Sequence, residues 1–167
     1  MEDFNSPLDI LVEIPGGSQN KYEYDPRRQA IRLDRVLYSS VHYPTDYGFI
    51  QDTLAEDGDH LDAIVLVSQP TFPGCLVSGR AVAVLRMQDY NGEDQKILCA
   101  CTSDPRMDGI RGLGTVPPHL LAEIENFFDT YKVLEHLQTT LRGWGDRDEA
   151  LAVVRAARAA YERRRDP

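Results

Sequence analysis

The apolar residues of the first hundred positions occur in short runs that are interrupted by turn residues. Leu8 to Ile14 is rich in apolar residues, and the stretches 21–24 and 30–33 alternate apolar with polar positions. Further runs follow at 62–67, 76–87 and 95–101, with Phe72-Pro73-Gly74 and Asn91-Gly92 between them. Short runs bounded by Pro, Gly and Asn are typical of β-strands joined by tight turns. We therefore expect a β meander or barrel over the first two-thirds of the chain.

The last third of the chain changes to helical spacing. The pair Pro117-Pro118 suits a first helical turn, and apolar residues recur three and four positions apart over 120–131. Asp146 followed by Glu149 has the form of a capping box, and an apolar stripe runs over 150–161. The sequence thus predicts two helices. No repeat or linker divides the chain, so we expect a single domain over residues 1–167.

Charge and apolar run length exclude two classes of function. The net charge is −9, which argues against a protein that binds nucleic acid by neutralising phosphates. The longest purely apolar runs, 63–67 and 81–85, are too short to cross a membrane. Residues 1–10 carry acids where a signal peptide carries bases, so we expect a cytoplasmic protein.

The three cysteines, Cys75, Cys99 and Cys101, do not have the spacing of a zinc or redox site. Cysteines outside such motifs usually pack as small apolar residues. We therefore expect three buried free thiols.

Acidic residues are concentrated in one region. No Lys or Arg occurs between Val36 and Gly79, yet six carboxylates fall within positions 46–62. The densest motif is Asp57-Gly58-Asp59-His60-Leu61-Asp62, directly before an apolar run. Carboxylates with a single imidazole favour Mg²⁺ or Mn²⁺ over zinc. An exposed acidic turn is an alternative that this motif alone leaves open.

Further polar groups could complete a phosphate site. Asp89 and Asp94 bracket the turn at Asn91-Gly92, and Lys96 follows it; a polar hairpin is the alternative. Three further bases would suit phosphate oxygens if they came together, although each alone is typical of a surface: Lys21, Arg35 and Lys132. The segment 43–49 is rich in phenols, which could donate to phosphate or pack in the core. Together such groups are what metal-assisted phosphoryl transfer to water needs.

Several motifs resemble, in order, those of the soluble family I inorganic pyrophosphatases of bacterial type. They are Glu13-Ile14-Pro15, Lys21-Tyr22-Glu23, Leu33-Asp34-Arg35, Tyr43-Pro44-Thr45-Asp46-Tyr47-Gly48, Asp57-Gly58-Asp59 with Asp62, Gly92-Glu93-Asp94-Gln95-Lys96 and Phe127-Phe128 with Tyr131-Lys132. The resemblance implies an α+β fold in which a five-stranded, OB-like β-barrel is flanked by two main α-helices. It also implies Mg²⁺-dependent hydrolysis of pyrophosphate to two phosphates.

The resemblance further implies a role for each matching residue. Asp59 would accept the proton of the attacking water. The metal ligands would be Asp57, Asp62, Asp89, Asp94 and Glu13, with Glu23 on the same acidic rim. The phosphoryl groups would be bound by Lys21, Arg35, Tyr47, Lys96, Tyr131 and Lys132, and Tyr43 matches a further active-site position.

The chain also departs from the family pattern at several positions. His60 stands where a proline is usual, Tyr90 where an acid is common, Val133 where an aspartate is usual, and Gln138 about where a lysine is expected. Bacterial members are commonly hexamers, so we expect a homo-oligomer. However, Asn126 and Thr130 occupy positions that often carry histidine at a subunit contact.

These departures keep two other hypotheses open. A diverged homologue could hydrolyse an organic diphosphate in a biosynthetic pathway. A non-enzymatic barrel could bind cations, whereas oligonucleotide binding is disfavoured because a basic groove is missing.

Overall fold

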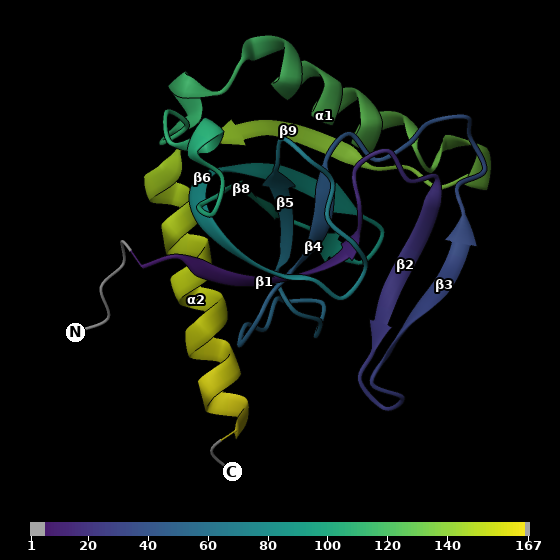
Figure 1. Cartoon of the computed structure of the whole chain (residues 1–167). Helices are drawn as coiled ribbons and strands as arrows, with labels where there is room; N and C mark the ends of the chain where they lie inside the picture. Colours follow the sequence, from purple (N-terminus) through teal and green to yellow (C-terminus); the bar gives the residue numbers. More distant parts are fainter. Residues whose placement is uncertain (1–5, 166–167) are drawn as a thin grey trace.

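Nine strands and two α-helices make up residues 6–165, the part of the chain that the computed structural model describes (Figure 1). The strands are β1 (Leu8–Ile14), β2 (Asn20–Asp25), β3 (Ala30–Val36), β4 (Asp46–Ile50), β5 (Asp62–Leu66), β6 (Leu76–Asp89), β7 (Gly92–Glu93), β8 (Lys96–Cys101) and β9 (Thr140–Gly145). The helices are α1 (Pro118–Thr130) and α2 (Arg147–Arg165), and short 3₁₀ turns lie at Pro105–Met107, Leu113–Thr115 and Val133–Glu135. The expected mixed α+β fold with two main helices is confirmed.

Five of the strands pair in a closed ring. β1 pairs with β4, β4 with β5, β5 with β8, β8 with β6, and β6 again with β1. The β5–β8 pair is parallel and the other pairs are antiparallel. β7 and β9 extend the sheet from β6. By contrast, β2 and β3 form a separate hairpin (Figure 1).

The expected count of five strands is too low. The main sheet has seven strands, and the β2–β3 hairpin forms a second sheet of two. Two of the strands, β4 and β9, did not appear among the predicted apolar runs, because they contain strand-disfavouring residues: Asp46 and Gly48 in β4, and Gly143 and Gly145 in β9. Pairing with distant strands forms them in spite of this composition.

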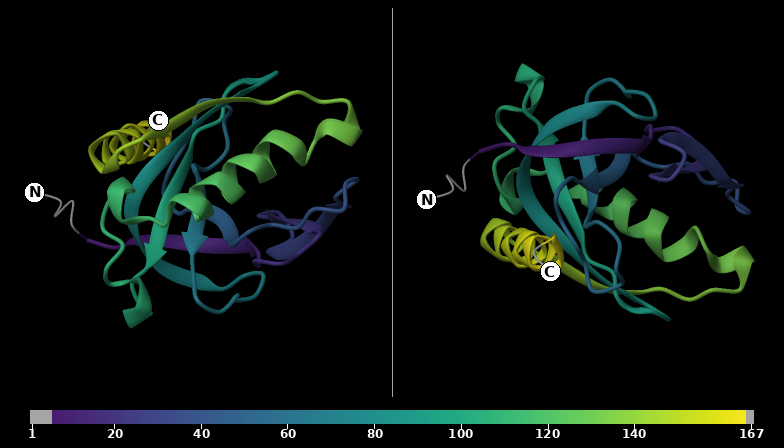
Figure 2. Two further views of the ribbon diagram at one scale, coloured as in Figure 1. Left: turned by 90° about the horizontal axis from the view of Figure 1, so that it is seen from above. Right: turned by 90° about the horizontal axis from the view of Figure 1, so that it is seen from below.

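Two apolar clusters fill the space on either face of the strands. Successive side chains of a strand point to opposite faces, so Ala63 and Val65 of β5 belong to one cluster, and Ile64 and Leu66 to the other. α1 buries Ile124, Phe127 and Phe128 in the second of these clusters. α2 buries Ala150, Val154 and Ala157 in the first, and Figure 2 shows the two helices lying apart. Because both faces of such strands are buried, their sequences are continuous apolar runs and do not alternate with polar residues.

The start of α2 is fixed by two carboxylates. The Asp146 carboxylate accepts the backbone N–H of Glu149 at 3.0 Å, as the capping motif predicts. The Glu149 carboxylate instead binds Arg86 of β6, with Nε–Oε1 and Nη2–Oε2 distances of 2.6 Å. This pair ties the helix to the longest strand of the sheet.

Asp46, one of the clustered acids, has a structural position. Its side chain is fully buried, and its carboxylate accepts the backbone N–H of Gly16 at 2.8 Å and that of Thr71 at 3.0 Å. It therefore joins two loops to the start of β4 and is not available to a cation.

All three cysteines are free thiols, but only two of them are buried. Cys99 and Cys101 lie inside the sheet on β8, and burial raises the pKa of the Cys99 thiol to about 12. The prediction of a buried thiol is wrong for Cys75, which is half-exposed because it closes the turn after Phe72. None of the helices within residues 6–165 is both long and apolar enough to cross a membrane.

Candidate active site

A cavity of about 670 Å³ opens between the ring of strands, the β2–β3 hairpin and the end of α1. The predicted acidic turn at 57–62 and the polar hairpin around Asn91 both open into it. Thirteen of the fourteen predicted site residues line this cavity: Glu13, Lys21, Glu23, Arg35, Tyr47, Asp57, Asp59, Asp62, Asp89, Asp94, Lys96, Tyr131 and Lys132. The fold thus gathers residues from both halves of the chain.

The acidic turn is shaped by its own backbone. The Asp57 carboxylate accepts the backbone N–H of Asp59 at 3.0 Å, and the Ala55 N–H donates to the Asp59 carbonyl at 2.7 Å. Gly58 between them has a φ of +89°, a conformation that favours glycine. Both aspartate side chains are exposed to the cavity, while Asp62 begins β5. Partial burial, together with the charge of Asp57, raises the pKa of Asp59.

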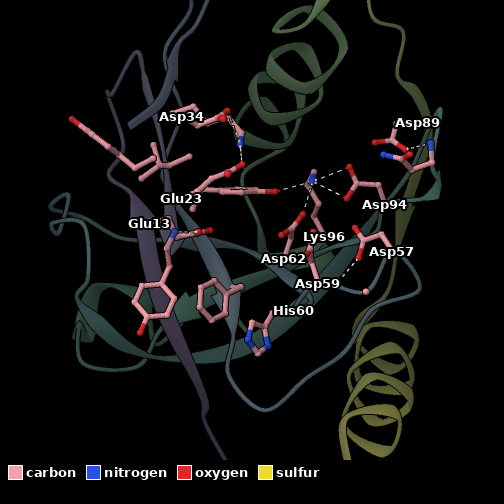
Figure 3. A pocket seen from close by; sticks show the side chains of 18 of the residues that line it. Glu13, Glu23, Asp34, Asp57, Asp59, His60, Asp62, Asp89, Asp94 and Lys96 are labelled. Atoms are coloured by element: carbon pink, nitrogen blue, oxygen red, sulfur yellow. Dashed lines mark hydrogen bonds and ion pairs between the residues drawn. The ribbon is translucent and has the colours of Figure 1, made fainter. Parts of the chain in front are cut away.

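Lys96 lies at the centre of the site (Figure 3). Its side chain is 2% exposed, and Nζ lies 3.0 Å from Oδ2 of Asp62 and 3.1 Å from Oδ1 of Asp94. Nζ also donates to the Tyr47 hydroxyl at 2.8 Å. Burial alone would lower the pKa of Lys96, but the two carboxylates raise it above its ordinary value, so the ammonium stays charged. One cation shared by two carboxylates leaves a net negative charge at this point.

The two tyrosines of the phenol-rich segment have different surroundings. Tyr47 on β4 is almost fully buried, yet its hydroxyl reaches Lys96. Tyr43 is 2% exposed, does not line the cavity, and packs between Tyr47 and Phe127 with ring centroids 5.5 and 4.6 Å away. Burial raises the pKa of both phenols well above its usual range. Tyr43 therefore supports Tyr47 from behind and does not face the cavity.

Two cavity bases are held by carboxylates, of which Asp34 and Glu135 have no role assigned from the sequence. Asp34 accepts hydrogen bonds from both Lys21 and Arg35, and these two cations lower its pKa against the effect of burial. Arg35 also pairs with Glu135, with Nη2 donating to Oε2 at 3.2 Å. Glu135 lies in the turn after α1, so its role could be found only from the fold. Lys21 is further paired with Glu23.

Glu13 lies at the end of β1 and faces the same cavity. Its carboxylate accepts the backbone N–H of Tyr24 at 2.8 Å, which links β1 to the hairpin. Burial raises the pKa of Glu13 to about 7, with the charge of Asp62 acting in the same direction. Ionisation of the Glu13 carboxylate at this buried position is therefore unfavourable unless a cation binds beside it.

On the opposite side of the cavity, Asp89 ends β6 and accepts the backbone N–H of Asn91 at 2.8 Å. Tyr90 between them is 74% exposed, at the mouth of the cavity. Lys132, just after α1, has its ammonium nitrogen 5.3 Å from the centre of the Tyr131 ring.

The lining has an excess of negative charge. Eight carboxylates and four Lys or Arg side chains line the cavity among the described residues. Within residues 6–165 no three Asp, Glu, His or Cys side chains form a ready-made metal cluster, and the Lys96 ammonium lies between Asp62 and Asp94. The donors are nevertheless hard oxygens in excess over cations, which is the chemistry that Mg²⁺ or Mn²⁺ prefers. The lining therefore fits a divalent cation by donor type and charge.

The departures from the family pattern fall in different places. His60 lines the cavity beside the acidic turn, and Tyr90 lies at its mouth. Val133 and Gln138 are exposed and lie outside the lining. Two of the four departures therefore do not touch the cavity wall.

Comparison with known proteins gives a consistent result. The sequence profile of the family described as inorganic pyrophosphatase matches residues 10–162. An inorganic pyrophosphatase of Methanosarcina mazei is 53% identical over 91% of this chain and 90% of its own length. One from Nostoc is 50% identical over 93% and 92%. The crystal structure of the inorganic pyrophosphatase from Thermus thermophilus superposes with a TM-score of 0.93 at 45% identity, covering 97% of this chain and 95% of that one.

Proposed function

The chain belongs to the inorganic pyrophosphatase family, and we propose that it carries out the family reaction in the acidic cavity with the help of Mg²⁺. It is an inorganic diphosphatase, which hydrolyses pyrophosphate to two orthophosphates. Hydrolysis of an organic diphosphate is not favoured, because relatives at 43–53% identity carry the name inorganic pyrophosphatase. The same finding argues against a barrel that only binds cations.

The oxygen ligands for Mg²⁺ would come from both acidic turns and from β1. We assign this role to Asp57, Asp62, Asp89, Asp94 and Glu13. Mn²⁺ is the alternative ion for the same oxygen ligands. The raised pKa of Glu13 supports the assignment, because a nearby divalent cation would favour the ionised carboxylate. Bound Mg²⁺ polarises phosphoryl oxygens and acidifies a coordinated water.

Asp59 is the proposed proton acceptor. In the hydrolytic step the oxygen of the attacking water bonds to phosphorus while the bridging P–O bond breaks, and the water's proton passes to the Asp59 carboxylate. Burial and Asp57 raise the pKa of this group, which makes it a better base than an ordinary aspartate. The exposed position of its side chain at the cavity supports access to water.

The cationic and phenolic residues of the cavity would bind the two phosphoryl groups. They are Lys21, Arg35, Lys96, Lys132, Tyr47 and Tyr131, with Glu23 and Asp34 holding the cations of the hairpin. Arg35 offers a planar fork for a phosphate, whereas each lysine offers a point charge. The observation that carries this proposal is the single cavity that brings these groups to face the carboxylates of both turns.

Phosphate release tests the proposal. Purified protein should release phosphate from inorganic pyrophosphate with Mg²⁺, and a chelator should abolish the release. Nucleoside and prenyl diphosphates serve as competing substrates. Negligible release from folded, Mg²⁺-supplied protein would overturn the assignment.

We further propose that residues 1–167 form one domain, that the five paired strands form the expected OB-like barrel, and that the protein is a homo-oligomer. A group of apolar residues exposed just after α1 supports an oligomer: Val133, Leu134 and Leu137. Light scattering on the purified protein measures its mass, and a monomer at micromolar concentration would contradict the last point. A hexamer is the state expected from the resemblance.

A further inference from the structure

We propose that His60 and Tyr161 are positioning residues, through which the C-terminal helix α2 holds the acidic turn 57–62 in place. The inference rests on the proposed function only in so far as this turn carries metal ligands and the proton acceptor. Neither residue is assigned a part in the chemistry.

The His60 ring lies between side chains from two other elements. One contact is a near-parallel stack on Phe49 of β4, with centroids 4.6 Å apart and ring planes 9° apart. The other is a tilted contact with Tyr161 of α2, with centroids 6.1 Å apart. Both separations fall in the range of favourable aromatic pairs. The ring's orientation is set further by Nδ1, which lies 2.8 Å from the Thr53 carbonyl and donates to it, since a carbonyl oxygen only accepts.

Backbone hydrogen bonds also connect the segment around His60 to α2. The Leu54 N–H donates to the Ala157 carbonyl at 2.9 Å, a bond between the loop before the turn and α2. Thr53 closes the loop on the other side, because its hydroxyl accepts the Leu61 N–H at 2.9 Å and donates to the Ile50 carbonyl at 2.6 Å. The turn is thus held by α2 at one end and by β4 at the other.

The contact between the loop and α2 is not a continuous packed interface. A cavity of about 490 Å³ lies between them, lined by Leu54, Ala55 and Leu61 and by small residues of α2 such as Ala156 and Ala160. The support that α2 gives to the acidic turn therefore depends on specific contacts beside this cavity, such as the His60–Tyr161 ring contact and the Leu54–Ala157 hydrogen bond. Since Asp59 precedes His60 directly and Asp62 follows two residues later, the contacts of the His60 ring restrain the short backbone segment that carries both carboxylates.

Hydrogen exchange in metal-free protein tests the positioning role without any appeal to activity. Tyr161→Ala should accelerate exchange of the Leu54, Ala55, Asp59 and Leu61 amides by about two- to tenfold, the range that an aromatic pair of this geometry is worth. Tyr161→Phe should leave exchange unchanged, because the ring and not the hydroxyl makes the contact. Glu162→Ala is the matched control, since Glu162 is exposed on the same helical turn. Exchange in Tyr161→Ala equal to that of Glu162→Ala would overturn the proposal.

A second measurement tests whether Tyr161 acts through His60. By calorimetry with Mg²⁺ alone, Tyr161→Ala and His60→Ala should each weaken binding by about tenfold, the lower range for residues that orient metal ligands. The double variant should bind no more weakly than His60→Ala. Additive losses would contradict the proposed route. If the wild type binds no Mg²⁺ at all, the metal assignment fails, whereas the exchange result still decides the positioning role.

Discussion

Lys96 is buried with its ammonium nitrogen 3.0 Å from the Asp62 carboxylate, and Asp94 shares the same ammonium at 3.1 Å. A single cation thus neutralises part of the charge of two carboxylates that are themselves largely withdrawn from solvent. The arrangement couples the stability of the metal-free protein to a group that also faces the substrate cavity. The change in unfolding free energy on addition of Mg²⁺ therefore reports how completely Lys96 neutralises the Asp62 and Asp94 carboxylates.

Replacement of Lys96 by Met should show how much the ammonium stabilises the metal-free protein. Without the ammonium, Asp62 and Asp94 are left without a compensating charge, so the free energy of unfolding in chelator should fall by about 2–4 kcal/mol. Mg²⁺ should restore more stability to Lys96→Met than to the wild type, because it supplies positive charge at the same carboxylates. Urea unfolding with and without Mg²⁺ measures both effects.

Lys132→Met is the control for this experiment, because Lys132 lines the cavity without a buried ion pair. It should change stability by less than about 1 kcal/mol. An equal loss in the two lysine variants would contradict the role given to the buried ammonium.

The proton acceptor can be tested by Asp59→Asn. The amide keeps the shape of the side chain but does not take up a proton, so kcat should fall by about 10²- to 10⁴-fold with little change in unfolding free energy. Phosphate release at saturating Mg²⁺ measures kcat, and circular dichroism checks the fold. Asp108→Asn, at an exposed aspartate outside the cavity, should keep full activity. Wild-type turnover in Asp59→Asn would remove Asp59 from the mechanism.

The pKa of Glu13 predicts a pH dependence of stability in metal-free protein. This pKa is about 7 in the folded state against an ordinary value of 4.5, so the folded form binds a proton more tightly than the unfolded form. The stabilisation is complete below pH 4.5 and is lost as the pH rises to about 7. Over that window Glu13 should cost up to about 3 kcal/mol of unfolding free energy, and Glu13→Gln should remove this part of the slope.

Unfolding in chelator at several pH values measures this slope. Glu162→Gln, at an exposed position, should retain the wild-type slope. Mg²⁺ should flatten the wild-type curve, because a cation near Glu13 favours its ionised form. A slope unchanged by Glu13→Gln would show that other groups govern this pH range.

Periodicity and turn chemistry were enough to predict most of the elements. The predicted strand Leu8–Ile14 coincides with β1, and the helix expected after Pro117 is α1. The same signals missed β4, because a strand with Asp46 and Gly48 has low intrinsic β-propensity. They also missed β9, whose Gly143 has a φ of +76°. Both strands are held by pairing with distant segments, which local sequence does not encode.

For the site, the sequence predicted residue types and their order better than their partners. Motif resemblance predicted the carboxylates and bases that line the cavity, but it did not show that Lys96 would lie between Asp62 and Asp94. The pairing of Glu135 with Arg35 also depends on the tertiary fold, because the two residues lie 100 positions apart in the sequence. Charge clustering alone does not distinguish Asp46 from the other acids of positions 46–62, although its hydrogen bonds to backbone make it structural.

The close approach of β4 to β1 leads to the last prediction, Gly48→Ala. A β-carbon at Gly48 would lie 1.9 Å from the Leu11 carbonyl oxygen and 2.9 Å from the Val12 α-carbon. These are backbone atoms of a paired strand and have no flexible side chain that could move aside. The strands must therefore separate, and the free energy of unfolding should fall by about 2–3 kcal/mol or more. Activity should fall as well, since Tyr47 beside Gly48 contacts Lys96.

Gly114→Ala provides the matched control for this steric argument. A β-carbon at Gly114 meets no atom within 4 Å, so this variant should change the unfolding free energy by no more than about 0.5 kcal/mol. Urea unfolding of both variants and phosphate release at saturating Mg²⁺ make the comparison. If Gly48→Ala proved as stable as Gly114→Ala, the β1–β4 spacing would have to be wider than the structure has it. The position of Tyr47 relative to Lys96 would then have to be reconsidered too.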